Sequence, residues 1–289
     1  MTSRSTKAET AERRQAILDI VRAQQPMTCR QVFYRAMVKG LVEKSEKGYL
    51  LSNTDLRILR RSGDIPYDFI VDNTREILRP KTYVSVEAAL EEAADDYCKN
   101  LWHDAEEIVM VFVEKDALSG VLWPVTSRFD VPLIVARGYN SLSALHGIAK
   151  TITAAAAAGQ RVNIYYFGDL DPSGTDAVRA AEETLRQMTA GCTTEKTLRF
   201  ERVAVTRAQA EKWNLPSRPT KTSDVRAKNF KGRSVELDAI EPDDLRALVR
   251  KVIQRHMPDA KFDELMAKED EERRLIRGLV DRVVEEAAS

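Results

Sequence analysis

Cysteines and long hydrophobic runs are scarce in this sequence. Its three cysteines, Cys29, Cys98 and Cys192, are odd in number and far apart in a chain of 289 residues, which fits neither a disulfide framework nor a zinc site. No stretch approaches the ~18 consecutive apolar residues of a membrane-spanning helix, and the polar amino-terminal segment lacks the apolar core of a signal peptide. These absences predict a cytoplasmic protein without a membrane partner.

The net charge of the chain is zero, but the charged residues are unevenly distributed. Residues 1–81 contain 16 basic against 10 acidic side chains, residues 82–120 contain 2 against 10, and residues 202–233 contain 9 against 2. Two basic blocks therefore flank an acidic one, which is expected where DNA lies on basic surfaces beside a carboxylate-rich site. Solvated faces of an unrelated protein would produce the same asymmetry, so both interpretations stay open.

Residues 1–82 are predicted to form a small helical domain. One helix ends before Pro26, and a second should begin at Thr28, because Thr28 followed by Gln31 is a capping-box pattern. A third helix is expected after Ser52, followed by an extended segment. Three helices and an extended wing are typical of a winged helix, whose third helix presents basic side chains to DNA phosphates. Those side chains are Arg57, Arg60 and Arg61.

Tyr34 is the candidate nucleophile of this domain. It lies one turn after Arg30 on the second predicted helix, so both side chains share a face. In the ordinary interpretation Tyr34 packs in the core. In the functional one its phenol attacks a phosphate whose charge Arg30 stabilises. Because an unperturbed tyrosine has a pKa of about 10, such attack needs proton removal and a cation at the phosphate.

Residues 83–289 follow a different pattern, in which strands alternate with helices. An acidic helix over residues 84–107 comes first. Alternation of this kind predicts βαβ units and a mainly parallel sheet, hence an α/β fold, and ligand sites in such sheets gather at the carboxyl ends of the strands. The predicted strands are residues 108–114, 131–138, 162–171 and 198–205.

Three acidic residues lie at these strand ends. Glu114 ends the first strand, and Asp169 and Asp171 end the third, two residues apart and so on one side of an extended chain. If the strands are neighbours, the carboxylates repel one another unless a cation lies between them. An all-oxygen ligand set suits one or two Mg²⁺ ions, or Mn²⁺, better than zinc. The structural alternative is that Asp171, which precedes Pro172, caps the next helix.

These motifs together resemble a known family. Glu114-Lys115 and Asp169-Leu170-Asp171-Pro172-Ser173-Gly174 resemble the Toprim domain of topoisomerases and primases. Residues 28–34, TCRQVFY, are similar to the stretch around the catalytic tyrosine of the topoisomerase VI A subunit and its meiotic double-strand-break relatives. Residues 235–242 are similar to bacterial and phage members, and the chain looks closest to the minimal A-like (Mini-A) proteins. The resemblance covers roughly residues 10–255, and the order of the motifs matches.

The resemblance implies a winged helix over residues 1–82 and a Toprim domain with a carboxyl-terminal extension over residues 83–289. It implies magnesium-dependent cleavage of double-stranded DNA, with Tyr34 forming a 5′-phosphotyrosyl link and Arg30 holding the phosphate. Glu114 would be a metal ligand or a general acid–base. A homodimer is also implied. The protein is expected on the bacterial nucleoid or as a phage-encoded protein. Whether it binds an ATPase B-type subunit stays open. The expected DNA contacts are Arg57, Arg60, Arg61, Lys115 and Arg137.

Three other functions remain open at this stage. A Toprim nuclease would keep the acids and use metal-activated water in place of Tyr34. A phosphatase of haloacid-dehalogenase type would use Asp169 as its nucleophile, and a DNA-binding protein would carry a degenerate site. The basic block 202–233 is a candidate DNA-backbone surface or a solvated loop. The charged residues 268–287 are predicted to form a helix that is solvated or packs in a dimer.

Overall fold

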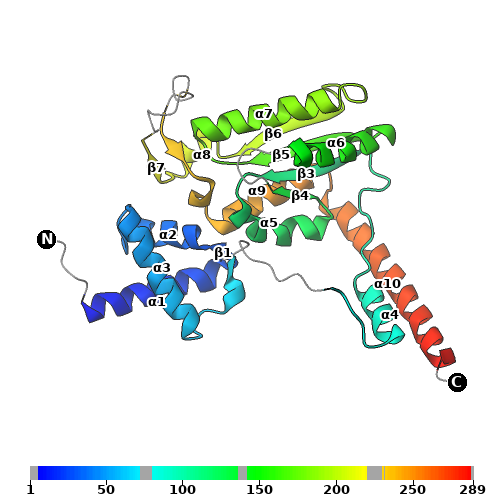
Figure 1. Ribbon diagram of the computed structural model, residues 1–289, viewed down its shortest axis with the longest axis horizontal. Coiled ribbons are helices and arrows are strands. Elements are labelled where there is room, and N and C mark those ends of the chain that lie inside the picture. The colour runs from blue at the N-terminus through cyan, green and yellow to red at the C-terminus, as the bar shows by residue number, and fades with distance from the viewer. Residues whose placement is uncertain (1–5, 72–79, 136–141, 220–229, 231, 288–289) are drawn as a thin grey trace.

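A parallel sheet forms the centre of the protein (Figure 1). The structure, a computed structural model, describes residues 6–71, 80–135, 142–219, 230 and 232–287. The four strands have the order β4-β3-β5-β6, and every neighbouring pair is parallel. The predicted α/β class with a mainly parallel sheet is therefore confirmed. The strands are β3 (Glu107–Val113), β4 (Leu133–Val135), β5 (Arg161–Phe167) and β6 (Leu198–Ala204).

Helices cover both faces of this sheet because its strands are apolar on both sides. Along β3, Val109 and Val111 pack with the helices of one face, while Met110 and Phe112 pack with those of the other. This alternation follows from the two-residue period of a strand. The first face carries α5 (Ser119–Thr126) and α9 (Pro242–Gln254), and the second carries α6 (Leu142–Ala157) and α7 (Pro172–Met188) (Figure 1).

The amino-terminal helices have a hydrophobic core of their own. The predicted capping box is confirmed: the Gln31 amide donates to Thr28 Oγ1 at 3.0 Å, and the Thr28 amide donates to Gln31 Oε1 at 2.9 Å. The elements are α1 (Lys7–Gln24), α2 (Cys29–Val38) and α3 (Glu46–Arg61), followed by the 3-10 turn η1 (Tyr67–Phe69) and a parallel strand pair, β1 (Met27–Thr28) and β2 (Ile70–Val71).

Two predicted helix boundaries were wrong. Helix α3 begins at Glu46 instead of after Ser52, because Ser45 caps it by accepting a 3.0 Å hydrogen bond from the Gly48 amide. A side chain at Gly48 would meet the Glu43 carbonyl oxygen at 2.1 Å, so glycine lets the preceding loop fold onto the helix. The acidic helix expected over residues 84–107 is only α4 (Val86–Asp95). The chain leaves the helix there because Trp102 is buried against the sheet, donating to the Phe129 carbonyl at 2.8 Å.

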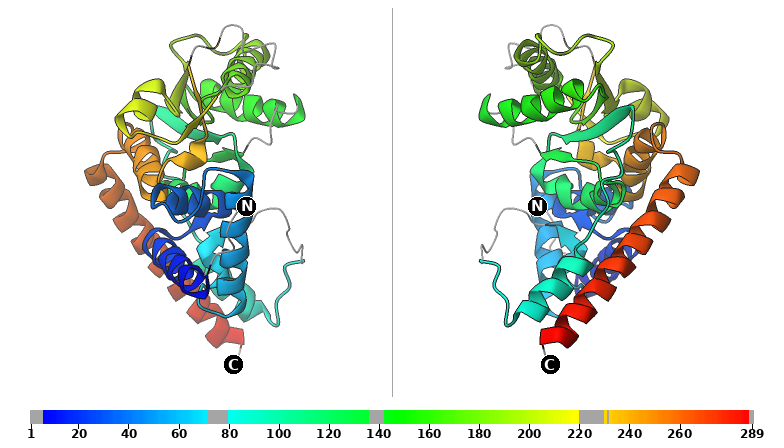
Figure 2. Two further views of the ribbon diagram at one scale, coloured as in Figure 1. Left: turned by 90° about the vertical axis from the view of Figure 1, so that its left-hand side faces the viewer. Right: turned by 90° about the vertical axis from the view of Figure 1, so that its right-hand side faces the viewer.

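Helix α10 (Asp259–Ala287) contains the predicted terminal helix and packs against α4, and the pair extends away from the sheet (Figures 1 and 2). None of the described helices is long and apolar enough to cross a membrane. An antiparallel ribbon is attached to the end of β5 by the bridge between Leu170 and Val235. The remaining elements are η2 (Asp116–Leu118), η3 (Ser127–Phe129), α8 (Arg207–Lys212), η5 (Leu237–Ala239) and the two ribbon strands, β7 (Ser217–Arg218) and β8 (Ser234–Val235).

Candidate active site

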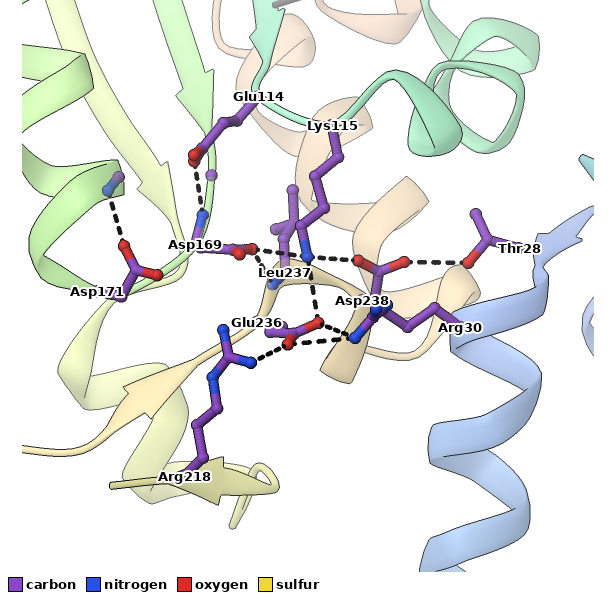
Figure 3. A network of polar contacts seen from close by, with 12 residues as sticks. Thr28, Arg30, Glu114, Lys115, Asp169, Asp171, Arg218, Glu236, Leu237 and Asp238 are labelled. Atoms are coloured by element: carbon purple, nitrogen blue, oxygen red, sulfur yellow. Dashed lines mark hydrogen bonds and ion pairs between the residues drawn. The ribbon is translucent and has the colours of Figure 1, made fainter. Parts of the chain in front are cut away.

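Glu114 and Asp169 meet at the carboxyl edge of the sheet. Val113, the last residue of β3, is in register with Phe167, the last residue of β5, so the residues that follow both strands are neighbours. Glu114 Oε2 accepts a hydrogen bond from the Asp169 amide at 3.0 Å (Figure 3). It also accepts one from the Tyr166 hydroxyl at 3.2 Å. A Cβ atom at Gly168 would lie 2.3 Å from Glu114 Oε2. Glycine at that position therefore makes room for the carboxylate.

Asp171 has the capping role that the sequence left open. Its Oδ1 atom accepts a 2.7 Å hydrogen bond from the Gly174 amide at the start of α7, and Pro172 occupies the first turn (Figure 3). This bond satisfies one of the free amides of the helix terminus. Because a carboxylate has two oxygens and about four acceptor positions, capping and metal binding are compatible roles for Asp171.

Burial and mutual repulsion shape the electrostatics of these acids. Burial raises the pKa of Glu114 above its usual range, and the charges of Asp169 and Asp171 raise it further. Burial also raises the pKa of Asp169, although the Lys115 ammonium opposes this effect. Carboxyl groups with raised pKa values beside like charges are a frequent feature of active sites. The negative charges of Asp169 and Asp171 thus act on Glu114.

A compact metal centre is not formed by these side chains in the structure. Within the described parts of the chain, no three Asp, Glu, His or Cys residues lie close enough together to hold a metal ion. Asp169 Oδ1 instead accepts from the Leu237 amide at 2.8 Å and pairs with Lys115 Nζ at 3.1 Å. The donor set still suits a hard cation, but Asp169 would have to exchange its contact with Lys115 for one with the ion.

Lys115 is the centre of a network of charged side chains (Figure 3). Besides Asp169, its ammonium group contacts Asp238 Oδ2 at 2.7 Å and Glu236 Oε2 at 3.3 Å. Burial lowers the pKa of Lys115, but the three carboxylates outweigh that effect and the net pKa is raised. The sequence predicts that Lys115 contacts DNA, whereas here its charge is balanced within the protein.

The same network extends to helix α2. Thr28 Oγ1 donates to Asp238 Oδ1 at 3.0 Å, and Arg30 Nη1 lies 3.0 Å from Glu236 Oε2 (Figure 3). Arg218 Nη1, on β7, lies 2.9 Å from the other oxygen of Glu236. Asp238 and Glu236 therefore connect the helix that carries Tyr34 to the edge of the sheet.

Tyr34 lies at the wall of a cavity of about 460 Å³. Its side chain is buried, its ring centroid is 5.4 Å from that of Phe33, and burial raises its pKa to about 12. The ordinary packing role and the catalytic role are thus both compatible with its position. The other residues that line the cavity are Arg30, Phe33, Lys44, Ser45, Glu46, Tyr49, Pro216, Ser217, Arg218, Ser234 and Glu236.

Three of the other predicted DNA contacts lie on helix α3. Arg57 and Arg61 are exposed. Arg60 is half-buried and stacks on the Tyr67 ring, with its guanidinium carbon 4.8 Å from the ring centroid. Arg137 lies outside the described residues, as does much of the basic block 202–233.

Several residues of this site were missed by the sequence reasoning. Glu236 and Asp238 alternate with apolar residues in a buried segment, a pattern that could have marked them as internal acids. Arg202 also went unnoticed: its guanidinium donates to the Gly168 carbonyl at 3.2 Å and to the Asp169 carbonyl, and burial lowers its pKa. Arg202 therefore places a positive charge next to Gly168 and Asp169 at the acidic edge.

Comparison with known proteins gives no relative of this chain. No protein-family model, curated protein or solved structure matches it.

Proposed function

We propose that this protein cleaves double-stranded DNA by transesterification through Tyr34, in the manner of the A subunit of a type IIB topoisomerase with winged-helix and Toprim domains. The observation that carries this proposal is the docking of helix α2 on the acidic edge of the sheet, through Thr28 and Asp238 and through Arg30 and Glu236. This docking holds the helix of Tyr34 and Arg30 against the network around Lys115, which follows Glu114 in the chain.

Magnesium is the cofactor of this proposal, with Mn²⁺ as its substitute. Glu114, Asp169 and Asp171 would hold one or two ions, because their carboxylates share one edge and repel one another there. A bound Mg²⁺ supplies Lewis-acid stabilisation of charge on the phosphate oxygens. The protein itself orients the Glu114 carboxylate, because the Asp169 amide and the Tyr166 hydroxyl both donate hydrogen bonds to it.

Tyr34 begins the reaction as a neutral phenol, since its pKa is raised to about 12. Its oxygen forms a bond to phosphorus while the bond from phosphorus to the 3′-oxygen breaks. The phenol proton passes to a base, for which Glu114 is the candidate. The departing 3′-oxygen takes a proton from solvent water and leaves as a hydroxyl. Lys115 and Arg30 favour this step because their positive charges lower the pKa of the phenol.

A Toprim nuclease is the second candidate function. The observation in its favour is the buried phenol of Tyr34, whose raised pKa makes it a weak acid and therefore a poor nucleophile, because it stays protonated. In that reaction Glu114 would accept a proton from water, a role that suits a carboxyl with a raised pKa. A phosphatase with Asp169 as nucleophile is less supported, because Lys115 and the Leu237 amide bind its Oδ1 atom.

Removal of the divalent metal tests the proposal. With end-labelled duplex DNA and Mg²⁺, we expect a covalent protein–DNA adduct that survives denaturing electrophoresis. Excess EDTA should abolish the adduct and restored Mg²⁺ should return it, because the carboxylates alone add negative charge beside the phosphate. An adduct whose yield is the same in EDTA would contradict the metal-dependent mechanism. DNA cleavage without any adduct would favour the nuclease.

A homodimer is also part of the proposal, and helix α10 offers a face for it. Leu275, Leu279 and Val283 recur every four residues and are 63%, 48% and 50% exposed. Antiparallel pairing of two α10 helices centred on Leu279 would bring Arg277, which pairs with Asp95 of its own chain at 2.6 Å, near Asp281 of the other copy. The charges of Arg277 and Asp281 are complementary.

Sedimentation velocity tests this face. We expect a dimer that Leu279→Asp converts to a monomer, because the charge would be buried at the centre of the apolar stripe. The matched control, Leu50→Asp on the exposed side of α3, should leave the dimer intact. A wild-type protein that sediments as a monomer at all concentrations would exclude the dimer.

A further inference from the structure

The cavity beside Tyr34 is larger and more varied than a single phosphate requires. Its volume of about 460 Å³ lies within the range of ligand sites, roughly 300–1,000 Å³. It lies between the α2–α3 segment and the β7–β8 ribbon, and the lining residues come from both. Aromatic rings line the helix side, whereas charged residues come from both sides. The basic ones among the described lining residues are Arg30, Lys44 and Arg218, and the acidic ones are Glu46 and Glu236.

Aromatic rings form the wall on the helix side. The rings of Phe33 and Tyr49 meet edge to face with centroids 5.5 Å apart, and the Arg30 guanidinium carbon lies 5.1 Å from the Tyr49 centroid. Tyr49 is half-buried, so part of its ring is available to a ligand. Aromatic faces backed by arginine are the usual surface on which a nucleic-acid base stacks.

Positive charges gather where the segment before α3 meets the ribbon. Lys44 Nζ donates to the Ser217 carbonyl, and Arg233 donates to the Ser217 hydroxyl at 2.6 Å. Arg218, which follows Ser217, forms an ion pair with Glu236, and so does Arg30. Burial lowers the pKa of Lys44, and the nearby charges of Arg233 and Arg218 lower it further. Glu236 offsets part of this repulsion, and the net pKa of Lys44 is still lowered. An anion bound beside Lys44 would relieve the remaining repulsion.

We propose that this cavity binds one unpaired nucleotide of the DNA, with its base against Phe33 and Tyr49 and its phosphate against Lys44 and Arg218. A base that stays paired and stacked in a duplex cannot place its face against Phe33 and Tyr49, so the nucleotide has to leave the stack. The site therefore selects DNA that is bulged or unwound next to the phosphodiester attacked by Tyr34. This inference rests on the proposed function, whose substrate it defines.

The test is fluorescence anisotropy with the full-length chain in EDTA, where cleavage does not occur. The probes are a labelled, fully paired duplex and the same duplex with one unpaired thymidine. Base–aromatic stacking predicts that the bulged duplex binds about 5- to 100-fold more tightly. Tyr49→Ala should abolish this preference and Tyr49→Phe should keep it, because phenylalanine retains the ring. Equal affinities for both duplexes in the wild type would overturn the inference.

Controls separate stacking from misfolding and from simple charge. Tyr83→Ala removes a partly exposed tyrosine beside α4 and should leave the preference intact. Lys44→Ala should weaken binding of both duplexes and reduce its salt dependence. Thymidine monophosphate and inorganic phosphate serve as competitors. If thymidine monophosphate alone binds as tightly as the bulged duplex, the site serves free nucleotides, and the assignment to a DNA strand is wrong.

Binding without metal also separates this inference from the proposed function. A protein that prefers the bulged duplex but never forms a tyrosyl adduct contradicts the proposed function alone. A protein that forms the adduct but keeps its bulge preference in Tyr49→Ala contradicts the cavity assignment alone.

Discussion

Tyr34→Phe should abolish the covalent protein–DNA adduct, a loss on the order of 10³-fold or more if Tyr34 is the nucleophile. The substitution removes only the hydroxyl, so the packing of the ring against Phe33 is retained and the fold should not change. DNA binding in EDTA should remain close to that of the wild type, because the side chains proposed to contact DNA are all present. The adduct is measured by denaturing electrophoresis of end-labelled DNA with Mg²⁺.

A second tyrosine provides the matched control for this experiment. Tyr83→Phe makes the same chemical change next to α4, away from the cavity, and should leave adduct formation unchanged. If Tyr34→Phe still cuts DNA at the wild-type rate, then Tyr34 is not the nucleophile and metal-activated hydrolysis becomes the better account. Loss of both DNA binding and cleavage would instead point to a role of the phenol in packing.

The sheet and its acidic edge could be predicted from sequence because both depend on local patterns. Apolar runs broken by helical stretches identify parallel strands, and residues after neighbouring parallel strands must share an edge. Glu114 and Asp169 therefore meet as expected. The Thr28 capping box was equally local, since both partners lie within four residues.

The rest of the site depends on contacts between residues far apart in the chain. Asp238 reaches Thr28 across 210 positions and Lys115 across 123, and no periodicity in the sequence encodes such a pairing. Lys115 follows Glu114 directly, so the sequence suggests only a cation near the acids. Whether that cation faces DNA or other side chains depends on the fold of the segment after β8. Here Glu236 and Asp238 surround it.

The predicted boundaries of α3 and α4 were wrong for a related reason. Gly48 ordinarily weakens a helix, which favours a later start for α3, but the glycine is needed where the helix approaches the Glu43 carbonyl. Trp102 fits a helical pattern in the acidic segment, yet burial of its ring against the sheet ends α4 early. In both cases tertiary packing outweighs local propensity.

Lys115→Met should lower the free energy of unfolding by about 3–5 kcal/mol, the usual effect of removing one partner from a buried ion network. Methionine has a similar length, so little packing is lost. Asp169, Glu236 and Asp238 would then face one another without the ammonium group that now contacts all three. Uncompensated carboxylates in a buried site repel strongly. Urea denaturation followed by circular dichroism measures the change.

Two further variants decide whether charge is the cause. Lys150→Met, on an exposed position of α6, makes the same substitution without a buried network and should change stability by less than about 0.5 kcal/mol. Adding Asp238→Asn to Lys115→Met should restore part of the loss, because the second change removes one of the unpaired charges. A single variant Lys115→Met as stable as the wild type would mean that the ammonium group does not stabilise the folded protein. Glu236 and Asp238, the two acids that contact α2, would then keep their positions without Lys115.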